Sequence, residues 1–241
     1  MLRFHYLSGI VFPLAFLFLF CQNGLSQGGR TFRYSNEIGV DFAPFLRGEP
    51  GISLLYKHGL GKTADLEQKK RYALRLQIGY YEYAYGYTTL RTLNMDTLSL
   101  TEGSGRTKHR FIRVGTELQV RKKNFRFHIG ADLGYRYYTS MGESQLLDRV
   151  GNMSFVTEQF EHESKYNVAE ASILAGINYF FLPRFSIGLE ANVSAGLEFS
   201  TSKTLQNGAV LRMDKGTLFE VGPRLLRLLT LSYHLGKPAE K

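Results

Sequence analysis

The sequence predicts an all-β protein, an eight-stranded antiparallel up-and-down transmembrane β-barrel. Apolar and polar residues alternate with a period of two over eight runs, which is typical of strands with one apolar and one polar face. No stretch beyond residue 20 approaches the ~18 consecutive apolar residues of a membrane-spanning helix. The 241 residues are 44% hydrophobic and 14% aromatic, which excludes a disordered chain.

Residues 1–26 are predicted to be a secretory signal peptide. Arg3 supplies a charged start, and Ile10–Phe20 is an unbroken apolar run that is too short to span a bilayer, which needs ~20 residues. Gly24 and Ser26 are the small residues expected three and one positions before a cleavage site. The barrel domain is therefore expected to comprise residues 27–241.

The chain has one cysteine, which excludes a disulfide framework and a cysteine-based zinc site. This residue, Cys21, also offers an alternative, a lipoprotein signal in which it carries the lipid. Phe20 precedes it where such signals normally have a small residue, so the secretory signal is preferred.

The expected strands are longer than globular strands, which average ~5–6 residues, and most reach the ~9–11 residues of a tilted membrane strand. Leu55 interrupts the alternation of the second run. Arg227 falls on the apolar positions of the eighth, which indicates a bulge or the membrane boundary. The runs cover roughly 35–46, 51–60, 71–87, 110–121, 125–139, 167–181, 185–200 and 217–235.

The links between these runs differ in length. Segments 88–109, 140–166 and 201–216 are expected to be long loops, 61–70 is intermediate, and the others are short. If the first strand begins in the periplasm, the three long loops all lie on the outer side. Short periplasmic turns and long outer loops are typical of outer-membrane barrels.

Glycine on the polar face distinguishes a membrane barrel from a soluble barrel of the lipocalin kind. Glycine weakens a solvated strand, but it suits the narrow interior of an eight-stranded barrel. The glycines concerned are Gly39, Gly79, Gly115, Gly130, Gly134, Gly176, Gly188, Gly196 and Gly222. The apolar face instead carries aromatic residues near strand ends, as membrane-interface girdles do: Tyr72, Tyr80, Phe125, Tyr135, Tyr137, Tyr179, Phe185 and Tyr233.

The signal peptide, eight alternating runs, glycine-rich polar face and closing segment LLTLSYHL resemble the small OmpA/OmpX-type outer-membrane β-barrel families. The resemblance extends over the whole mature chain and is one of pattern, without a diagnostic motif. It departs from the family after Tyr233, where GKPAEK follows in place of an aromatic terminus. It implies an integral protein of the bacterial outer membrane.

Ten charged residues occupy the middle of the polar face, five basic and five acidic. Buried charges are costly unless paired, so they are expected to form a salt-bridge network that plugs the interior. A narrow ion path is the functional alternative, and acid–base catalysis is disfavoured because no route for a substrate is evident. The residues are Arg75, Arg113, Arg126, Arg136 and Arg224 with Glu117, Asp132, Glu190, Glu198 and Glu220.

Other chemical motifs are weak, and no catalytic residue, cofactor or metal is expected. His128 and His234 have interior positions and are interpreted as hydrogen-bonded fillers. Glu161, His162 and Glu163 are a minor candidate for a divalent cation. His162 and Ser164 form an H-x-S pair similar to that of the lipid A deacylase barrels, but no acid follows at a comparable spacing.

The formal charge of +9 does not indicate a nucleic-acid partner, because the basic residues are distributed over turns and loops. Basic periplasmic turns suit an anionic leaflet, and basic outer segments suit lipopolysaccharide phosphates. Outer-membrane lipid and lipopolysaccharide are therefore expected partners.

The acidic segment 140–166 is the predicted partner-binding loop, because a solvated loop has little use for seven apolar side chains. They are Leu146, Leu147, Val150, Met153, Phe155, Val156 and Phe160. The alternative is that they pack on neighbouring loops and cap the barrel. The leading hypothesis is a non-enzymatic scaffold or accessory subunit that contacts another envelope protein. A narrow passive pore and a lipid A-modifying enzyme are the alternatives.

Overall fold

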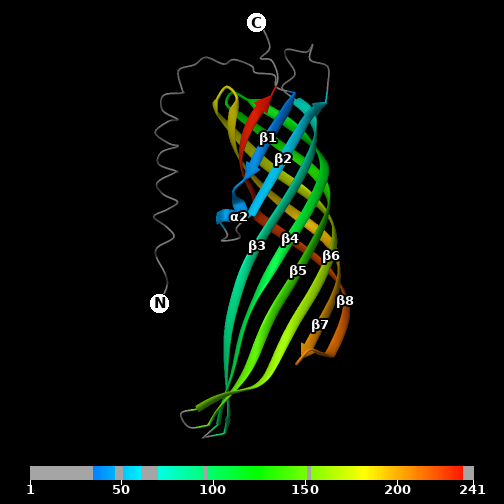
Figure 1. Ribbon diagram of the computed structural model, residues 1–241. Helices are drawn as coiled ribbons and strands as arrows, with labels where there is room; N and C mark the ends of the chain where they lie inside the picture. Colours follow the sequence, from blue (N-terminus) through cyan, green and yellow to red (C-terminus); the bar gives the residue numbers. More distant parts are fainter. Residues whose placement is uncertain (1–34, 47–50, 61–69, 95–96, 151–152, 236–241) are drawn as a thin grey trace.

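The computed structural model describes residues 35–46, 51–60, 70–94, 97–150 and 153–235, and it confirms the eight-stranded antiparallel barrel. Each strand pairs with its neighbours in sequence, and β1 pairs with β8 to close the ring (Figure 1). The strands are β1 (Asn36–Asp41), β2 (Gly51–Leu60), β3 (Lys70–Asn94), β4 (Thr97–Lys122), β5 (Phe125–Val150), β6 (Met153–Leu182), β7 (Phe185–Gln206) and β8 (Ala209–Leu235). The predicted signal peptide, residues 1–26, lies outside the described residues.

The ring is closed only at the end where the short turns lie. There, β1 pairs with Thr230–Leu235 of β8, and β2 pairs with β3 as far as Tyr81. Beyond this level β3–β8 continue as a curved, open sheet, longest in β3–β6 (Figure 1). We call this part the extension: residues 82–94, 97–108, 139–150, 153–165, 201–206 and 209–215.

The prediction of long outer loops is wrong. Segments 88–109, 140–166 and 201–216 are almost entirely strand, and continuous ladders run through all three hairpins. The sequence did not reveal them, since alternation is the signal for a half-buried strand and these strands lack a continuous apolar face. The β7–β8 hairpin closes with Asn207 (φ 49°) and Gly208 (φ 81°), the Asn-Gly pair that a tight two-residue turn favours.

The expected first strand, 35–46, is also wrong in its second half. The strand ends at Asp41, and a single helical turn, α2 (Ala43–Leu46), follows. Asp41 Oδ1 accepts hydrogen bonds from the backbone N–H of Ala43 at 2.9 Å and of Leu229 at 3.1 Å, which anchors the turn to β8. Pro44 has no N–H to donate to a ladder, so the strand cannot continue through it.

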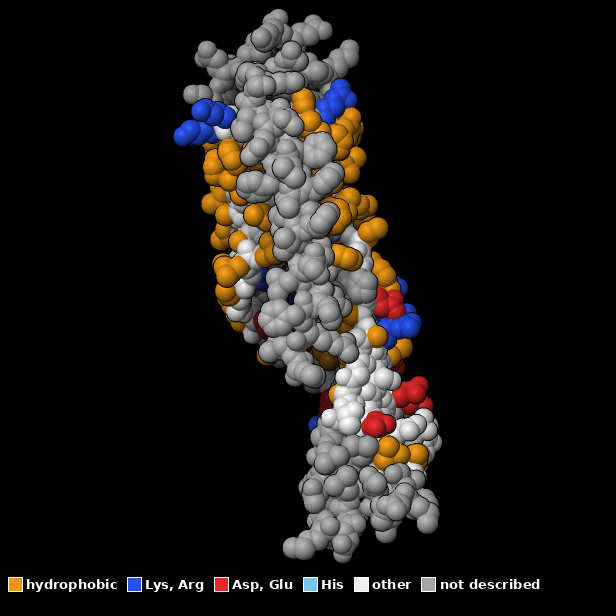
Figure 2. All heavy atoms as spheres, turned by 90° about the vertical axis from the view of Figure 1, so that its left-hand side faces the viewer, with side chains coloured by type: hydrophobic (Ala, Val, Ile, Leu, Met, Phe, Trp, Pro, Cys, Tyr) orange, Lys and Arg blue, Asp and Glu red, His pale blue; other side chains and the backbone are white. Residues whose placement is uncertain are grey.

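The two faces of the barrel wall have opposite polarity, as predicted. On β4 the outward residues from Ile112 to Val120 are apolar except Thr116, and the next outward positions are Arg110, Lys108 and Arg106. Orange apolar side chains cover the visible barrel wall in Figure 2, whereas the described part of the extension is mostly white or charged. Among the described residues, no helix is long and apolar enough to cross a membrane.

Glycine makes room for the interior contents. A Cβ atom on Gly115 would lie 2.1 Å from the Ala131 carbonyl oxygen, and one on Gly176 would lie 2.5 Å from the His128 ring. Gly222 differs, because nothing lies within 4 Å of its Cβ position. The interior is thus filled to contact along most of the closed barrel, but not beside Gly222.

Arg227 owes its position to a bulge, the first of the two predicted explanations. Glu190 pairs with Leu228 and Asn192 with Arg224, so four steps on β8 oppose two on β7. The inserted residues rotate Arg227 to the interior, where it is 5% exposed, and leave Leu225 89% exposed on the outside.

We expect Gly115→Ala to destabilise the barrel by about 1–3 kcal/mol, because the new methyl group meets the backbone of β5. The urea midpoint of the detergent-folded protein measures this effect. Gly222→Ala is the matched control and should leave the midpoint nearly unchanged. Equal midpoints for the two variants would contradict the close packing at Gly115.

Candidate functional site: the charged interior and the inner face of the extension

Arg75 is the centre of an ion-pair network that crosses the barrel interior. This β3 side chain lies 3.0 Å from Glu117 on β4, 3.1 Å from Asp132 on β5 and 2.9 Å from Glu190 on β7. All four side chains are at most 3% exposed. One guanidinium therefore joins carboxylates from three strands, and its planar fork suits several simultaneous acceptors.

Three more cationic or ring groups contact the same carboxylates. Together with Arg75 and its three partners they form what we call the central layer. The Lys57 ammonium donates to both oxygens of Glu117, at 2.9 and 3.0 Å. Arg227 donates to Asp132 at 2.8 Å and lies 3.5 Å from Glu190. The His128 ring lies 3.2 Å from Glu190. Each carboxylate of this layer thus contacts at least two cationic or imidazole groups.

Further ion pairs lie on each side of the central layer. Toward the short turns, Arg126 donates to Glu37 at 2.6 Å. Toward the extension, Glu170 lies 2.6 Å from Arg113 and 2.9 Å from Arg136. Charged pairs consequently occupy the interior at three successive levels.

Seven of the ten residues predicted for this network form ion pairs: Arg75, Arg113, Glu117, Arg126, Asp132, Arg136 and Glu190. Glu198 instead accepts a hydrogen bond from the Tyr138 hydroxyl. Glu220 and Arg224 are exposed and, within the described part of the chain, have no ion-pair partner within 4 Å. Both line a pocket of about 440 Å³ at the mouth of the barrel, beside Gly222.

Four members of the network were missed by the sequence analysis. Glu37, Lys57 and Glu170 all lie on the polar positions of predicted strands, so the alternation that located the others also applies to them. Arg227 falls on the apolar positions of its predicted strand, and only the bulge turns its side chain to the interior. Glu37, Lys57 and Glu170 could have been found by counting every charged residue on the polar face of each predicted strand.

Glu117, His128 and Glu190 place their ligand atoms within 4.8 Å of one another, a grouping with the composition of a metal site. Both carboxylates, however, already bind cations, namely Lys57 and Arg75. Because these cations already neutralise the two carboxylates, the arrangement favours an ion-pair network.

His162 points to the concave inner side of the extension, and its hydrogen-bond partners are not the predicted ones. Its Nε2 lies 3.1 Å from Ser144 Oγ on β5, and its Nδ1 lies 3.3 Å from Thr204 Oγ1 on β7. Ser164, the expected partner, has no such contact with it among the described residues. Because the ring lies on the inner face, the resemblance to a lipid-facing His–Ser pair is not supported.

Glu161, His162 and Glu163 cannot hold one ion together. Successive strand residues point to opposite faces, so the two glutamates flank the outer side while His162 faces inward. Glu163 also forms an ion pair with Lys165 at 2.8 Å.

The predicted partner-binding segment forms the end of the β5–β6 hairpin. Leu146, Leu147 and Phe160 are half-buried, and Val156 is 57% exposed. A one-residue bulge separates the pairs Leu146–Glu158 and Leu147–Val156. The side chains of Val150, Met153 and Phe155 lie outside the described residues.

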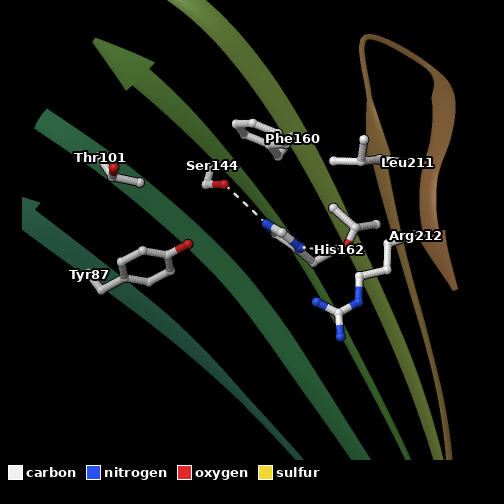
Figure 3. Close-up of a pocket in the computed structure, with 8 residues that line it drawn as sticks. Tyr87, Thr101, Ser144, Phe160, His162, Leu211 and Arg212 are labelled. Atoms are coloured by element: carbon white, nitrogen blue, oxygen red, sulfur yellow. Dashed lines mark hydrogen bonds between the residues drawn. The ribbon is translucent and has the colours of Figure 1, made fainter. Parts of the chain in front are cut away.

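Ser144 and His162 line a pocket of about 520 Å³ on the inner face of the extension. Figure 3 shows Tyr87 from β3 and Arg212 from β8 on opposite sides of His162, with Phe160 beyond the ring. The remaining lining residues are Thr101, Thr204 and Leu211.

Comparison of the chain with family models, with curated proteins and with solved structures gave no match.

We expect Arg75→Met to lower the free energy of unfolding by about 3–5 kcal/mol, because it leaves buried carboxylates without their shared partner. Urea unfolding of the detergent-folded barrel measures the loss. Arg106→Met is the control, since its ion pair with Glu82 is solvent-exposed and should contribute little. Similar losses in the two variants would show that Arg75 is not the centre of the network.

Proposed function

We propose that this chain is an integral bacterial outer-membrane barrel of the OmpA/OmpX kind, closed to ions, that acts without catalysis as a scaffold. Its extension would stand outside the membrane and bind partners, including another envelope protein. The observation that carries the proposal is the inverted polarity of the wall. Charged side chains are buried, whereas Leu133, Ile173 and Val114 are 71, 67 and 55% exposed. A water-soluble protein gains nothing from such an exterior.

The dimensions of the apolar band support a bilayer as its environment. On β4 the band extends over nine residues, from Ile112 to Val120, which is close to the ~9–11 residues of a tilted membrane strand. Tyr72 and Tyr80 stand at the two ends of the corresponding stretch of β3 and are 63 and 39% exposed. Aromatic residues at both edges of an apolar band are typical of membrane interfaces.

Basic residues follow this band on the side of the extension. Arg106, Lys108 and Arg110 are successive outward residues of β4, and Lys165 and Lys203 occupy the outer face of β6 and β7. Their position is that of lipid headgroup phosphates if the band lies in the bilayer. It supports lipopolysaccharide as the lipid partner on this side.

The three levels of ion pairs support a closed interior and argue against the pore hypothesis. In planar bilayers the purified protein should give no steady single-channel conductance in 1 M KCl (roughly 3 Å screening length). A variant of a buried pair, Arg113→Ala, should increase the frequency of transient openings because it removes one of the two ion-pair partners of Glu170. A stable open level in the unmutated protein would overturn the closed-barrel proposal.

The membrane orientation can be tested with single thiols in a Cys21→Ser background, which removes the chain's only cysteine. Thr201→Cys in the extension should react with a membrane-impermeant maleimide in intact cells. Lys122→Cys, next to the β4–β5 turn, should react only after the outer membrane is permeabilised. Both positions are exposed in the structure, so equal labelling in intact cells would contradict the proposed topology.

A further inference from the structure

Tyrosine rings form a row along the inner face of β3, from the barrel mouth into the extension. Tyr81, Tyr83, Tyr85 and Tyr87 occupy successive inward positions, about 6.7 Å apart along the strand. At the base of the row, the His109 ring stacks on Tyr138 with centroids 4.8 Å apart. The inner face is therefore aromatic from the barrel mouth to the pocket of Figure 3.

Two of these rings lie against glycine, and this fixes their orientation. Tyr87 pairs with Gly103, and Tyr85 pairs with Gly105. A Cβ atom at Gly103 would be 2.4 Å from Tyr87 Cζ, and one at Gly105 would be 2.5 Å from Tyr85 Cζ. The rings therefore extend across the backbone of β4, and any larger residue would displace them. Glycine within a strand commonly marks a place where another group approaches the backbone closely.

The tyrosines remain accessible from the concave side. Tyr85 is 37% exposed and Tyr87 is 43% exposed. The Tyr85 hydroxyl lies 3.2 Å from Ser140 Oγ, which holds the ring across two strands. Two oriented aromatic surfaces thus border an open concavity.

Hydroxyl and imidazole groups face these rings from the other side of the pocket. Ser144, His162 and Thr204 form a hydrogen-bonded chain across β5, β6 and β7. The one charged lining residue described, Arg212, is paired with Asp214 at 2.6 Å. The lining offers aromatic faces and many polar contacts with no uncompensated charge.

We propose that this inner face, lined by Tyr85, Tyr87, Ser144, His162 and Thr204, binds an uncharged, hydroxyl-rich oligosaccharide. The C–H groups of a sugar ring carry partial positive charge and pack on the negative face of an aromatic ring. The sugar hydroxyls match the Ser–His–Thr chain and the paired Arg212. The pocket volume of about 520 Å³ is within the ~300–1,000 Å³ range of ligand sites.

The inference names a ligand class for the extension and rests on the proposed scaffold function. Binding can nevertheless be measured on the full-length barrel in detergent, without any assumption about membrane orientation. Failure of the cell-labelling test would leave the binding result valid, and failure of binding would leave the barrel proposal valid. The two proposals are therefore distinguishable.

Saturation-transfer NMR with two probes tests the inference and separates the possible sources of the sugar. One probe is an uncharged O-polysaccharide fragment of lipopolysaccharide, free of lipid and of the phosphorylated core, and the other is a neutral glucan oligomer of six residues. We expect the C–H protons of at least one probe to receive saturation, with a response that rises to a plateau on titration. Absence of transfer from both probes, each at about 10 mM, would overturn the proposal.

Substitutions at Tyr87 identify the contact. Tyr87→Leu should weaken binding roughly tenfold because the ring face is lost, whereas Tyr87→Phe should bind within about twofold of the unmutated protein. Each variant is first checked on a gel for a difference in migration between the boiled and the unboiled protein. This difference depends on the closed barrel, which is distant from Tyr87. If Tyr87→Leu loses this difference, Tyr85→Leu, which removes the neighbouring exposed ring, takes its place with the same expected weakening. Unchanged affinity in the folded variant would refute the site.

Discussion

The fold depends on neutralising charge inside a narrow ring. Eight strands leave an interior that side chains must fill, and here ion pairs occupy its centre among uncharged polar and apolar side chains. Arg75 can remain charged only because Glu117, Asp132 and Glu190 converge on it from three strands. These carboxylates in turn hold Lys57 and Arg227, so the register of six strands is coupled through one cluster. A slip of any of them by one residue would move a charge to the apolar exterior.

Glycine and the apolar exterior follow from the same constraint. Long, hydrated side chains such as arginine need space, and Gly115 provides it beside Asp132. With polar groups consumed inside, the outer wall consists of the apolar residues that alternate with them. The polar interior and the apolar exterior thus have one origin, the alternation of polar and apolar residues along each strand.

The sequence predicts the strands of the barrel wall, where polar and apolar residues alternate. It does not predict the strands of the extension, where this alternation is absent. The wall from Arg71 to Tyr80 alternates cleanly, because each side chain meets either the interior or the exterior. The outer face of the extension is mostly polar, and its inner face mixes tyrosines with hydroxyl and imidazole groups. Its strands therefore show no regular apolar–polar alternation, although Asn207-Gly208 marks one turn. The bulge at Arg227 is a further limit, since residue type alone did not decide between a bulge and the membrane boundary. Pairing partners such as Arg126 and Glu37, 89 residues apart, required the closed ring to bring them together.

The short β1–β2 hairpin has a topological consequence for the extension. β8 pairs with β1 only from Thr230 onward, and β3 pairs with β2 only up to Tyr81, so among the described residues no strand joins the two edges along the extension. The extension, which lies below the closed ring in Figure 1, is therefore a trough with one open side. A tube admits a polymer only by its end, which must be threaded. A trough admits a chain anywhere along its length, so a long molecule with both ends anchored elsewhere can still be laid into it and lifted out sideways.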